Sequence, residues 1–254
     1  MPDRLGALST AAQRLRSVPW LRTLVRRLRW IGIRHRCSCC GSWLHRFVAH
    51  PSDLEMTYQS ICPVCQCKPV HRRGALFLRE LAGTDPKRGR ILHIAPEGSI
   101  AAVLHASFVG DYTSCDIAPR KGQVQADIAR LPFDDGQFGL LYCCHVLMLV
   151  PGEDLDAAVA ECYRVMQPGG LAIIEHPVKQ GPNLDLEYEP ESVRAAQFYY
   201  PEILRLFGAD EYWPMFEKAG FEVRRDAVFS AVQCARYALY ERQQEYLVKP
   251  GSRG

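Results

Sequence analysis

The chain has 254 residues, 48% of them hydrophobic and 23% charged, which is typical of a globular protein with room for one large domain and a small additional module. No stretch approaches the roughly 18 consecutive apolar residues that a transmembrane helix needs, so the sequence offers no candidate for one. The net charge of +3 conceals an uneven distribution, because nine arginines and a single acid, Asp3, fall within residues 1–36, and the remainder is mildly acidic.

Residues 1–36 form a basic leader whose pattern becomes amphipathic after Pro19. Apolar and arginine side chains recur there at helical spacing on different faces, with Leu21, Leu24, Val25, Leu28 and Ile31 on one and Arg22, Arg26 and Arg29 on the other. Such a helix suits an anionic membrane surface, a nucleic acid or an organellar targeting function. It equally suits the acidic body of the protein itself, and docking on that body is the interpretation we prefer.

The eleven cysteines favour a reducing compartment over a disulfide framework. Six lie between residues 37 and 67, and the other five sit in apolar stretches, namely Cys115, Cys143, Cys144, Cys162 and Cys234. The odd total, the adjacent pair at 143–144 and the lack of a cleavable hydrophobic signal predict a cytoplasmic protein with metal-bound thiolates.

The sequence predicts a four-cysteine zinc site in a small zinc-ribbon-like module over residues 37–73. Two C-x-x-C pairs can present four thiolates at the corners of one tetrahedron, Cys37 and Cys40 from the first pair and Cys62 and Cys65 from the second. A glycine directly after the first pair and a proline inside the second suit the tight turns this requires. Because the protein supplies all four ligands, Zn²⁺ would have a structural role.

Two features leave details of this zinc module open. Cys39 and Cys67 are additional thiols that could replace one of the four ligands. The neighbouring basic residues could contact a phosphate or a nucleic acid, although a solvated face is the preferred interpretation for Arg46, Lys68, His71, Arg72 and Arg73.

After a connecting helix and linker over residues 74–89, strands and helices alternate throughout residues 90–245. This alternation predicts an α/β fold, a doubly wound and mostly parallel sheet with helices on both faces. We expect seven strands, at 91–95, 112–117, 123–126, 138–144, 171–175, 221–228 and 230–240, and helices at 98–108, 154–166 and 209–219. The last two strands follow one another too closely for a crossover and must pair antiparallel. Residues 246–254 are expected to form a disordered tail.

The loops that follow the parallel strands are the expected ligand site, because ligands of open α/β sheets bind beyond the carboxyl ends of the strands. The first loop, residues 95–97, lacks the G-x-G-x-x-G pattern of dinucleotide sites, and its acid Glu97 suits a positively charged sulfonium amino acid better. Asp116 ends the second strand, where a carboxylate can accept hydrogen bonds from ribose hydroxyls. Further on, Asp127 and Ile128 can offer adenine a hydrogen-bond acceptor and an apolar wall.

Several motifs recur in a defined order along the chain. They are Leu-His-Ile-Ala-Pro-Glu at 92–97, D-I-x-x-L-P-F within 126–133, His-Val-Leu at 145–147, Tyr-Arg-Val-Met-Gln-Pro-Gly-Gly at 163–170, Ala-Gly-Phe at 219–221, and a C-P-x-C stretch followed by a basic pair within 62–72. Together they resemble the class I S-adenosylmethionine-dependent methyltransferases of the type 11 group, in particular a branch with that first motif in place of a glycine-rich loop. The resemblance covers about residues 62–228.

The resemblance implies a Rossmann-like class I methyltransferase fold and S-adenosylmethionine as the cofactor. It also implies that the cofactor is bound by Ala95, Pro96, Glu97, Asp116, Ile117, Asp127 and Ile128, with Cys144 and His145 beside it. The branch usually continues His-Val-Leu-Glu-His, but this chain has Met148 and Leu149 in place of the Glu-His pair. A downstream G-Q-x-D-H-x-R segment keeps only Gln197 and Arg205. Both segments should face the acceptor, so the resemblance does not name the acceptor.

Methyl transfer from a sulfonium needs a general base only when the acceptor is a hydroxyl or a protonated amine. The candidates for such a catalytic role follow the fourth and fifth strands and are His145, Glu175 and His176. Residues 178–207 are expected to form a lid over the acceptor, with Tyr188, Phe198, Tyr199 and Tyr200 as its aromatic residues.

The leading hypothesis is a methyltransferase acting on a small molecule or a biosynthetic intermediate. A second is a methyltransferase for RNA or protein that docks through the zinc module and the basic leader. A third is a degenerate methyltransferase fold that serves as a binding module. The sequence leaves peripheral membrane contact, nucleic-acid contact and the oligomeric state open.

Overall fold

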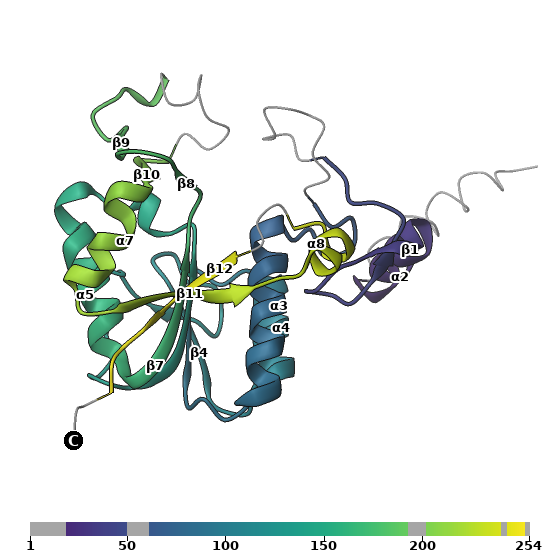
Figure 1. The fold of residues 1–254 in the computed structure, drawn as a ribbon, viewed down its shortest axis with the longest axis horizontal. Coiled ribbons are helices and arrows are strands. Elements are labelled where there is room, and N and C mark those ends of the chain that lie inside the picture. Colours follow the sequence, from purple (N-terminus) through teal and green to yellow (C-terminus); the bar gives the residue numbers. More distant parts are fainter. Residues whose placement is uncertain (1–18, 50–60, 193–201, 240–242, 252–254) are drawn as a thin grey trace, which may run out of the picture.

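The computed structural model describes residues 19–49, 61–192, 202–239 and 243–251, with side chains from residue 24 onward. Its main body is a seven-stranded sheet covered by helices on both faces, and a smaller N-terminal module lies beside one helical layer (Figure 1). This architecture confirms the expected class I methyltransferase-like α/β fold.

The seven strands lie in the order β11-β12-β7-β6-β3-β4-β5. They are β3 (Ile91–Ile94), β4 (Tyr112–Asp116), β5 (Val124–Gln125), β6 (Phe138–Cys144), β7 (Met166–Glu175), β11 (Glu222–Val228) and β12 (Gln243–Val248). All pairs among β7, β6, β3, β4 and β5 are parallel, and β12 runs antiparallel between β11 and β7. The last two strands pair antiparallel, as predicted, although the second of them lies at Gln243–Val248 and not at 230–240.

Helices α3 (Pro69–Thr84) and α4 (Gly98–Ser107) cover one face of the sheet, and α5 (Leu155–Val165) and α7 (Ala209–Lys218) cover the other (Figure 1). The central strand β6 is buried along its whole length and is apolar throughout, as expected for a strand covered on both faces. Its side chains alternate between the two cores, with Leu140, Tyr142 and Cys144 toward α3 and α4 and Leu141 and Cys143 toward α5 and α7.

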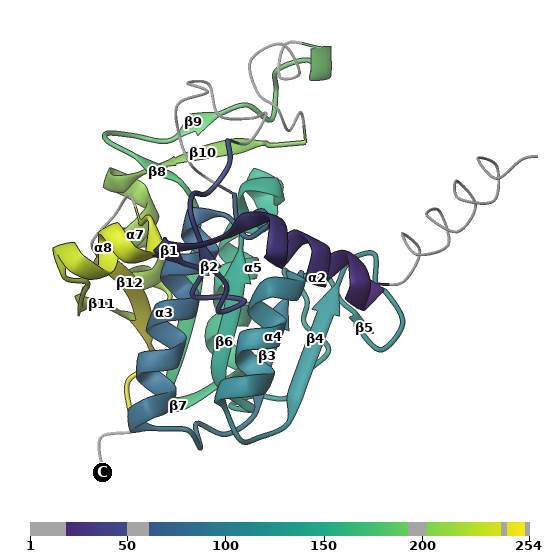
Figure 2. The ribbon, with the colours of Figure 1, turned by 90° about the vertical axis from the view of Figure 1, so that its right-hand side faces the viewer.

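The carboxyl ends of β3, β4, β6 and β7 share one edge of the sheet because these strands are parallel. A small sheet of β8 (Val178–Lys179), β10 (Arg205–Gly208) and β9 (Leu184–Asp185) stands beyond that edge (Figure 2). It lies where the lid was expected, and its Tyr188 is 92% exposed. The other three predicted lid aromatics, Phe198, Tyr199 and Tyr200, lie outside the described residues.

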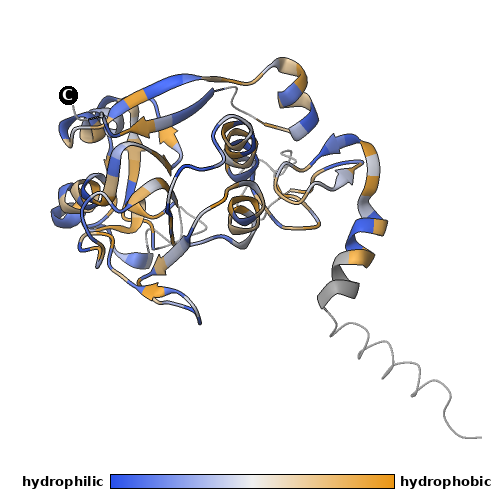
Figure 3. Cartoon of the chain, turned by 90° about the horizontal axis from the view of Figure 1, so that it is seen from below, coloured by the Kyte–Doolittle hydropathy of each residue, from blue (hydrophilic) through white to orange (hydrophobic). Residues whose placement is uncertain are grey.

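The N-terminal module contains α2 (Pro19–Trp30), β1 (Ile31–Arg36) and β2 (Trp43–Leu44), and α8 (Ala231–Tyr237) packs against β1. Helix α2 projects away from the main body, with apolar and polar residues around its described part (Figure 3). The preferred interpretation of the leader, docking on the acidic body, is wrong for this part, because Leu24, Val25 and Leu28 are 43%, 55% and 62% exposed. Within the described ranges, no helix is long and apolar enough to cross a membrane.

Several predicted boundaries differ from the structure, among them the start of the fifth strand, expected at residue 171 and found at Met166 in β7. The last strand was expected at 230–240, but α8 occupies most of that range and the strand follows at β12. The reason is a capping box, in which the Ser230 side chain accepts a hydrogen bond from the Gln233 amide and starts a helix. Strand β12 also extends through the boundary expected at 245–246, and α3 begins at Pro69 within the range assigned to the zinc module.

The first turn of α3 carries three basic residues that were expected on a solvated face, and all three are buried. Arg72 is fully buried, with its guanidinium 3.9 Å from the Phe47 ring centroid. It donates hydrogen bonds to the carbonyls of Tyr237 (2.8 Å), Ala238 (2.9 Å) and Cys67 (3.3 Å). Arg72 thus joins the main body to both α8 and Cys67, which follows the second cysteine pair.

Replacing this side chain with an apolar one of similar length should destabilise the protein. Arg72→Met leaves the carbonyls of Tyr237 and Ala238 without this donor and removes one of the two donors to the Cys67 carbonyl, and we expect a loss of about 3 kcal/mol in the free energy of unfolding, measured by urea denaturation. Arg34→Met, at an exposed position of β1, is the matched control and should change stability by less than about 0.5 kcal/mol. Equal stability of the two variants would contradict this assignment of Arg72.

Candidate cofactor site and metal centre

The two C-x-x-C segments fold into two turns of the same geometry. In the first, the Gly41 amide donates to the Cys37 carbonyl at 2.8 Å, and in the second the Gln66 amide donates to the Cys62 carbonyl at 2.8 Å. Gly41 and Gln66 both have a left-handed backbone, with φ of 73° and 62°. The turn predicted from the glycine is confirmed, and the second pair achieves it without one.

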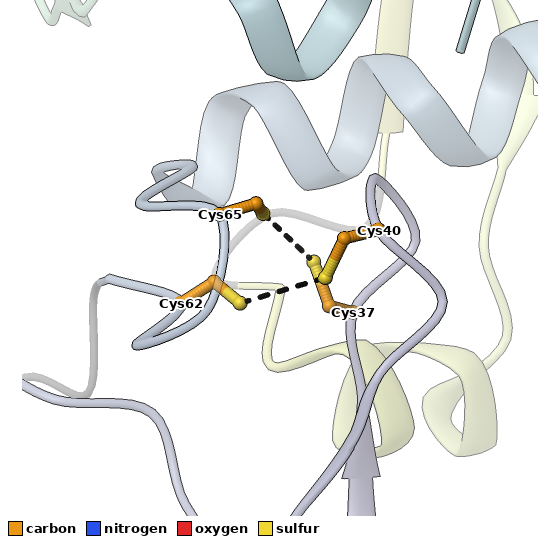
Figure 4. A group of neighbouring side chains, drawn as sticks. All are labelled: Cys37, Cys40, Cys62 and Cys65. Carbon is orange, nitrogen blue, oxygen red and sulfur yellow. Dashed lines mark hydrogen bonds between the residues drawn. The ribbon is translucent and has the colours of Figure 1, made fainter. Parts of the chain in front are cut away.

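The two turns bring the four predicted ligands together (Figure 4). The Sγ atoms of Cys37 and Cys65 are 3.7 Å apart and those of Cys40 and Cys62 are 3.9 Å apart, and all four sulfurs lie within 4.8 Å of one another. Four thiolates at about 2.3 Å from a tetrahedral zinc lie about 3.8 Å from one another. The donor set therefore fits Zn²⁺ in a closed site.

The two additional thiols form a smaller group with Cys37. The Sγ atoms of Cys37, Cys39 and Cys67 also lie within 4.8 Å of one another, and all three residues are buried. This group offers three ligands, one fewer than a closed structural zinc site needs. Cys39 donates instead to the carbonyl of His71.

Two non-glycine residues with a left-handed backbone mark the carboxyl edge of the sheet. Ala95 (φ 49°) directly follows β3 and His145 (φ 59°) directly follows β6. This conformation costs about 1–2 kcal/mol for a residue with a side chain, and such strain clusters at functional sites. Both residues stand where the central parallel strands end, which makes this edge the candidate site.

Glu97 precedes α4 at the same edge and is held by two imidazole rings. Its Oε2 lies 3.1 Å from Nε2 of His93, and its Oε1 lies 3.5 Å from Nε2 of His71. The Tyr112 hydroxyl, 2.9 Å from Nδ1 of His93, can donate to that nitrogen and leave the ring proton on Nε2, facing Glu97. Burial alone would raise the pKa of Glu97, but the nearby imidazoles of His71 and His93 outweigh it and lower that pKa to about 2.

Asp116 and Asp127 have the same local geometry. One carboxylate oxygen of each accepts a hydrogen bond from the amide two residues further on, at 2.9 Å in both cases. This turn orients the carboxylate and leaves its other oxygen available to a ligand. Ile117, beside Asp116, is 73% exposed and offers an apolar surface, whereas the Ile128 side chain is 6% exposed and belongs to the core.

His145 and His176 follow β6 and β7, with ring centroids 6.2 Å apart. Burial, followed by the charges of Lys68 and His71, lowers the pKa of His145 to about 4. Burial lowers the pKa of His176 as well, and its ring packs against Phe207. Within the described part of the chain, Nε2 of His145 and both ring nitrogens of His176 are buried without a hydrogen-bond partner. Two neutral imidazoles with unused nitrogens therefore line the edge.

Glu175, the third residue expected to be catalytic, has a structural role. It is 4% exposed and accepts hydrogen bonds from Arg73 (3.0 Å), Gln244 (2.8 Å) and the Tyr142 hydroxyl (3.1 Å). These hydrogen bonds direct both of its oxygens toward the chain itself, and a role of Glu175 toward a substrate stays a prediction.

His71 and His93 belong to the site, although the pattern analysis assigned them no part in it. His71 lies close enough to Cys144 and His145 to suggest a second metal group. However, its Nδ1 accepts from the Lys68 amide at 3.3 Å, which leaves the ring proton on Nε2 and removes that lone pair from metal binding. The available sequence signal was the strand histidine beside Glu97 in the first motif and the histidine that opens the basic run at 71–73.

Glycine usually lowers the stability of a protein, but the strained backbone at Ala95 predicts that glycine there does not lower the free energy of unfolding. Ala95→Gly removes the Cβ that disfavours the left-handed backbone, and we expect it to leave the free energy of unfolding unchanged or raise it by up to about 1 kcal/mol. The same change at Ala102, exposed in α4, should cost about 1 kcal/mol. Urea denaturation of both variants checks this, and a larger loss at Ala95 than at Ala102 would contradict it.

Comparison with known proteins agrees with this geometry. Residues 95–174 match the family described as Methyltransferase domain. The chain is similar to the ubiquinone/menaquinone biosynthesis C-methyltransferase UbiE of Brucella canis, with 32% identity over 177 residues, which is 61% of this chain and 64% of that protein. It is 28% identical to the protein of the same name from Desulfotalea psychrophila over 159 residues, 55% of this chain and 61% of the relative. The chain thus spans somewhat less than two thirds of the length of these relatives.

The fold is similar to a solved methyltransferase structure. The crystal structure of Burkholderia thailandensis 1,6-didemethyltoxoflavin-N1-methyltransferase, with bound 1,6-didemethyltoxoflavin and S-adenosylhomocysteine, superposes with a TM-score of 0.50 at 14% identity. The match covers 71% of this chain and 78% of that one. The strand order and this similarity show the class I methyltransferase fold, and residues 95–174 within it match the methyltransferase domain model.

Proposed function

We propose that the protein is an S-adenosylmethionine-dependent methyltransferase that acts on a small molecule. The observation that carries the proposal is the ionised Glu97, which two imidazoles face at the edge of the sheet where the strained residues Ala95 and His145 follow β3 and β6. A carboxylate in that position suits a cofactor that carries an ammonium group and a sulfonium. The match of residues 95–174 to the methyltransferase domain family supports the same conclusion.

The polar groups at the carboxyl edge of the sheet can be matched to the ammonium group, the ribose and the adenine of this cofactor in turn. Glu97 would pair with the ammonium group beside the backbone of Ala95 and Pro96, and the free oxygen of Asp116 would accept from the ribose hydroxyls. Ile117 would cover one face of the adenine, and Asp127 with the backbone of Ile128 would meet its amine and edge. Cys144 and His145 would lie beside the reacting end. When bound, S-adenosylmethionine supplies an activated methyl group.

The chain's own residues at the reacting end would orient the acceptor and exclude water. His145 is a weak base because burial lowers its pKa to about 4, so we assign it a hydrogen bond to the acceptor in preference to proton abstraction. His176 has unused nitrogens and stands on the acceptor side, next to the sheet of β8, β9 and β10.

A small-molecule acceptor is favoured over RNA or protein by two observations. The named relatives are C-methyltransferases of ubiquinone/menaquinone biosynthesis. In addition, Arg72 and Arg73 are buried and cannot serve as a docking surface for a polyanion. We further propose that Zn²⁺ occupies the Cys37, Cys40, Cys62 and Cys65 site as a structural ion. We also propose a cytoplasmic location, since cysteines grouped as metal ligands suit a reducing compartment.

Calorimetric titration with S-adenosylmethionine tests the cofactor. The protein should bind it with micromolar affinity and should not bind NAD. Asp116→Ala should weaken binding at least about tenfold, because it removes the acceptor for the ribose hydroxyls. The exposed Asp134→Ala is the control and should bind like the unaltered protein. Binding of neither ligand would reject the enzyme proposal in favour of a degenerate fold.

Metal analysis of purified variants tests the zinc assignment. One zinc per chain is expected in the unaltered protein, and Cys62→Ser should lose it and lower the melting temperature, because the remaining thiolates no longer close the site. Cys234→Ser, which removes a thiol outside the cluster, should keep the zinc. If Cys67→Ser or Cys39→Ser loses the metal while Cys62→Ser retains it, the ligand set is the group of Cys37, Cys39 and Cys67.

A further inference from the structure

We infer that His71 is a positioning residue of the cofactor site and that, through it, metal binding at the four cysteines is coupled to cofactor binding at the edge of the sheet. The inference rests on the proposed function, because it concerns the same cofactor. The zinc module would then affect cofactor binding as well as stabilise the fold.

The turn of the first cysteine pair is hydrogen-bonded directly to α3. Ser38 Oγ donates to the Arg72 carbonyl at 2.6 Å, and Cys39 Sγ donates to the His71 carbonyl at 3.4 Å. In the opposite direction, Arg79 of α3 donates to the carbonyls of Ser38 (2.8 Å) and Cys39 (3.2 Å). Four hydrogen bonds thus join residues 38 and 39, which lie between the two ligands of the first pair, to two turns of α3.

The second cysteine pair leads into the same helix. The Cys62 amide donates to the Cys67 carbonyl at 3.0 Å, and the next residue, Lys68, is the N-cap of α3. Arg72 returns to the Cys67 carbonyl. Both pairs therefore converge on the first turn of α3, and a metal that joins the pairs also holds this turn.

The first turn of α3 places His71 against the cofactor site. The side chain is 9% exposed, and the Lys68 amide donates to its Nδ1, so Nε2 carries a proton that faces Oε1 of Glu97. The two atoms are 3.5 Å apart, an ion-pair distance at which the buried Nε2 makes no closed hydrogen bond, so its one potential partner among the described residues is the carboxylate. The other carboxylate oxygen, Oε2, faces His93 from β3. Glu97 is therefore oriented by one donor from the sheet and one from the helix that the metal module holds.

The two donors make the orientation of Glu97 dependent on both parts of the molecule. Without His71, Oε1 loses its partner and the carboxylate can rotate about its hydrogen bond to His93. The negative charge is then no longer fixed in the position where the ammonium group would meet it. Without metal, the two cysteine pairs lose their common centre, and the turn that carries His71 loses its support. Both changes act on the same oxygen, so they should not be additive.

Reciprocal titrations test the coupling with S-adenosylhomocysteine as the probe. Its affinity is measured on zinc-loaded and chelator-treated protein, and the zinc affinity is measured by competition with a chromogenic chelator with and without the probe. We expect zinc to raise the affinity for the probe at least about fivefold and the probe to raise the zinc affinity by the same factor, since coupling free energies are reciprocal. The readouts are affinities and do not depend on activity.

Variants of α3 separate positioning from structure. His71→Ala should keep one zinc per chain, weaken binding of the probe about tenfold and reduce the coupling factor to about one, because the donor to Glu97 is gone. His71→Gln, which retains an N–H donor, should recover part of the affinity. Val70→Ala perturbs the same turn without approaching Glu97 and should keep the coupling. Should His71→Ala fail to fold, the comparison of His71→Gln with Val70→Ala decides.

The outcomes distinguish this inference from the proposed function. Probe binding by the zinc-loaded protein with the same affinity in the absence of zinc, or full coupling in His71→Ala, would overturn the inference and leave the methyltransferase proposal intact. Absence of any probe binding by the zinc-loaded, unaltered protein would overturn both.

Discussion

The buried ion pair between Arg73 and Glu175 joins α3 to the carboxyl end of β7, and the candidate site is arranged around it. The charged atoms are 3.0 Å apart, and the two side chains are 10% and 3% exposed. Burial alone would lower the pKa of Arg73, but Glu175 raises it, so the guanidinium stays charged. An unpaired charge at this depth would cost several kcal/mol, so the first turn of α3 has one position on the sheet. That position also brings Arg72 to the end of α8 and His71 to Glu97.

The edge of the sheet holds an ionised carboxylate and two neutral imidazoles close to one another. Two N–H donors keep Glu97 ionised, whereas burial keeps His145 and His176 neutral. A cationic cofactor would meet the ionised acid, and the acceptor would meet neutral rings. The cysteine cluster supplies no chemistry to this edge. Its contribution is to hold the helix from which His71 reaches the acid.

Elements with a strong local signal were predicted well. The apolar runs of β3 and β6, the acids that follow β3 and β4, and the four-cysteine spacing all lie where the pattern placed them. Helix α8 was predicted as part of a strand at 230–240, whereas the capping box of Ser230 with Gln233 starts a helix there. The basic run at 71–73 was assigned to solvent because its partners are remote in the chain. Glu175 lies 102 residues from Arg73, and Tyr237 lies 165 residues from Arg72.

The sequence by itself determined the alternation of strands and helices, the four thiolates and the acids at the strand ends, because each depends on residues only a few positions apart. The tertiary structure decided the rest. It made Glu175 a structural partner, kept Glu97 ionised, turned His71 toward it and left the apolar face of α2 exposed. Each of these outcomes depends on groups brought together from distant parts of the chain, and burial and pairing of charge are properties of that assembly, not of local pattern.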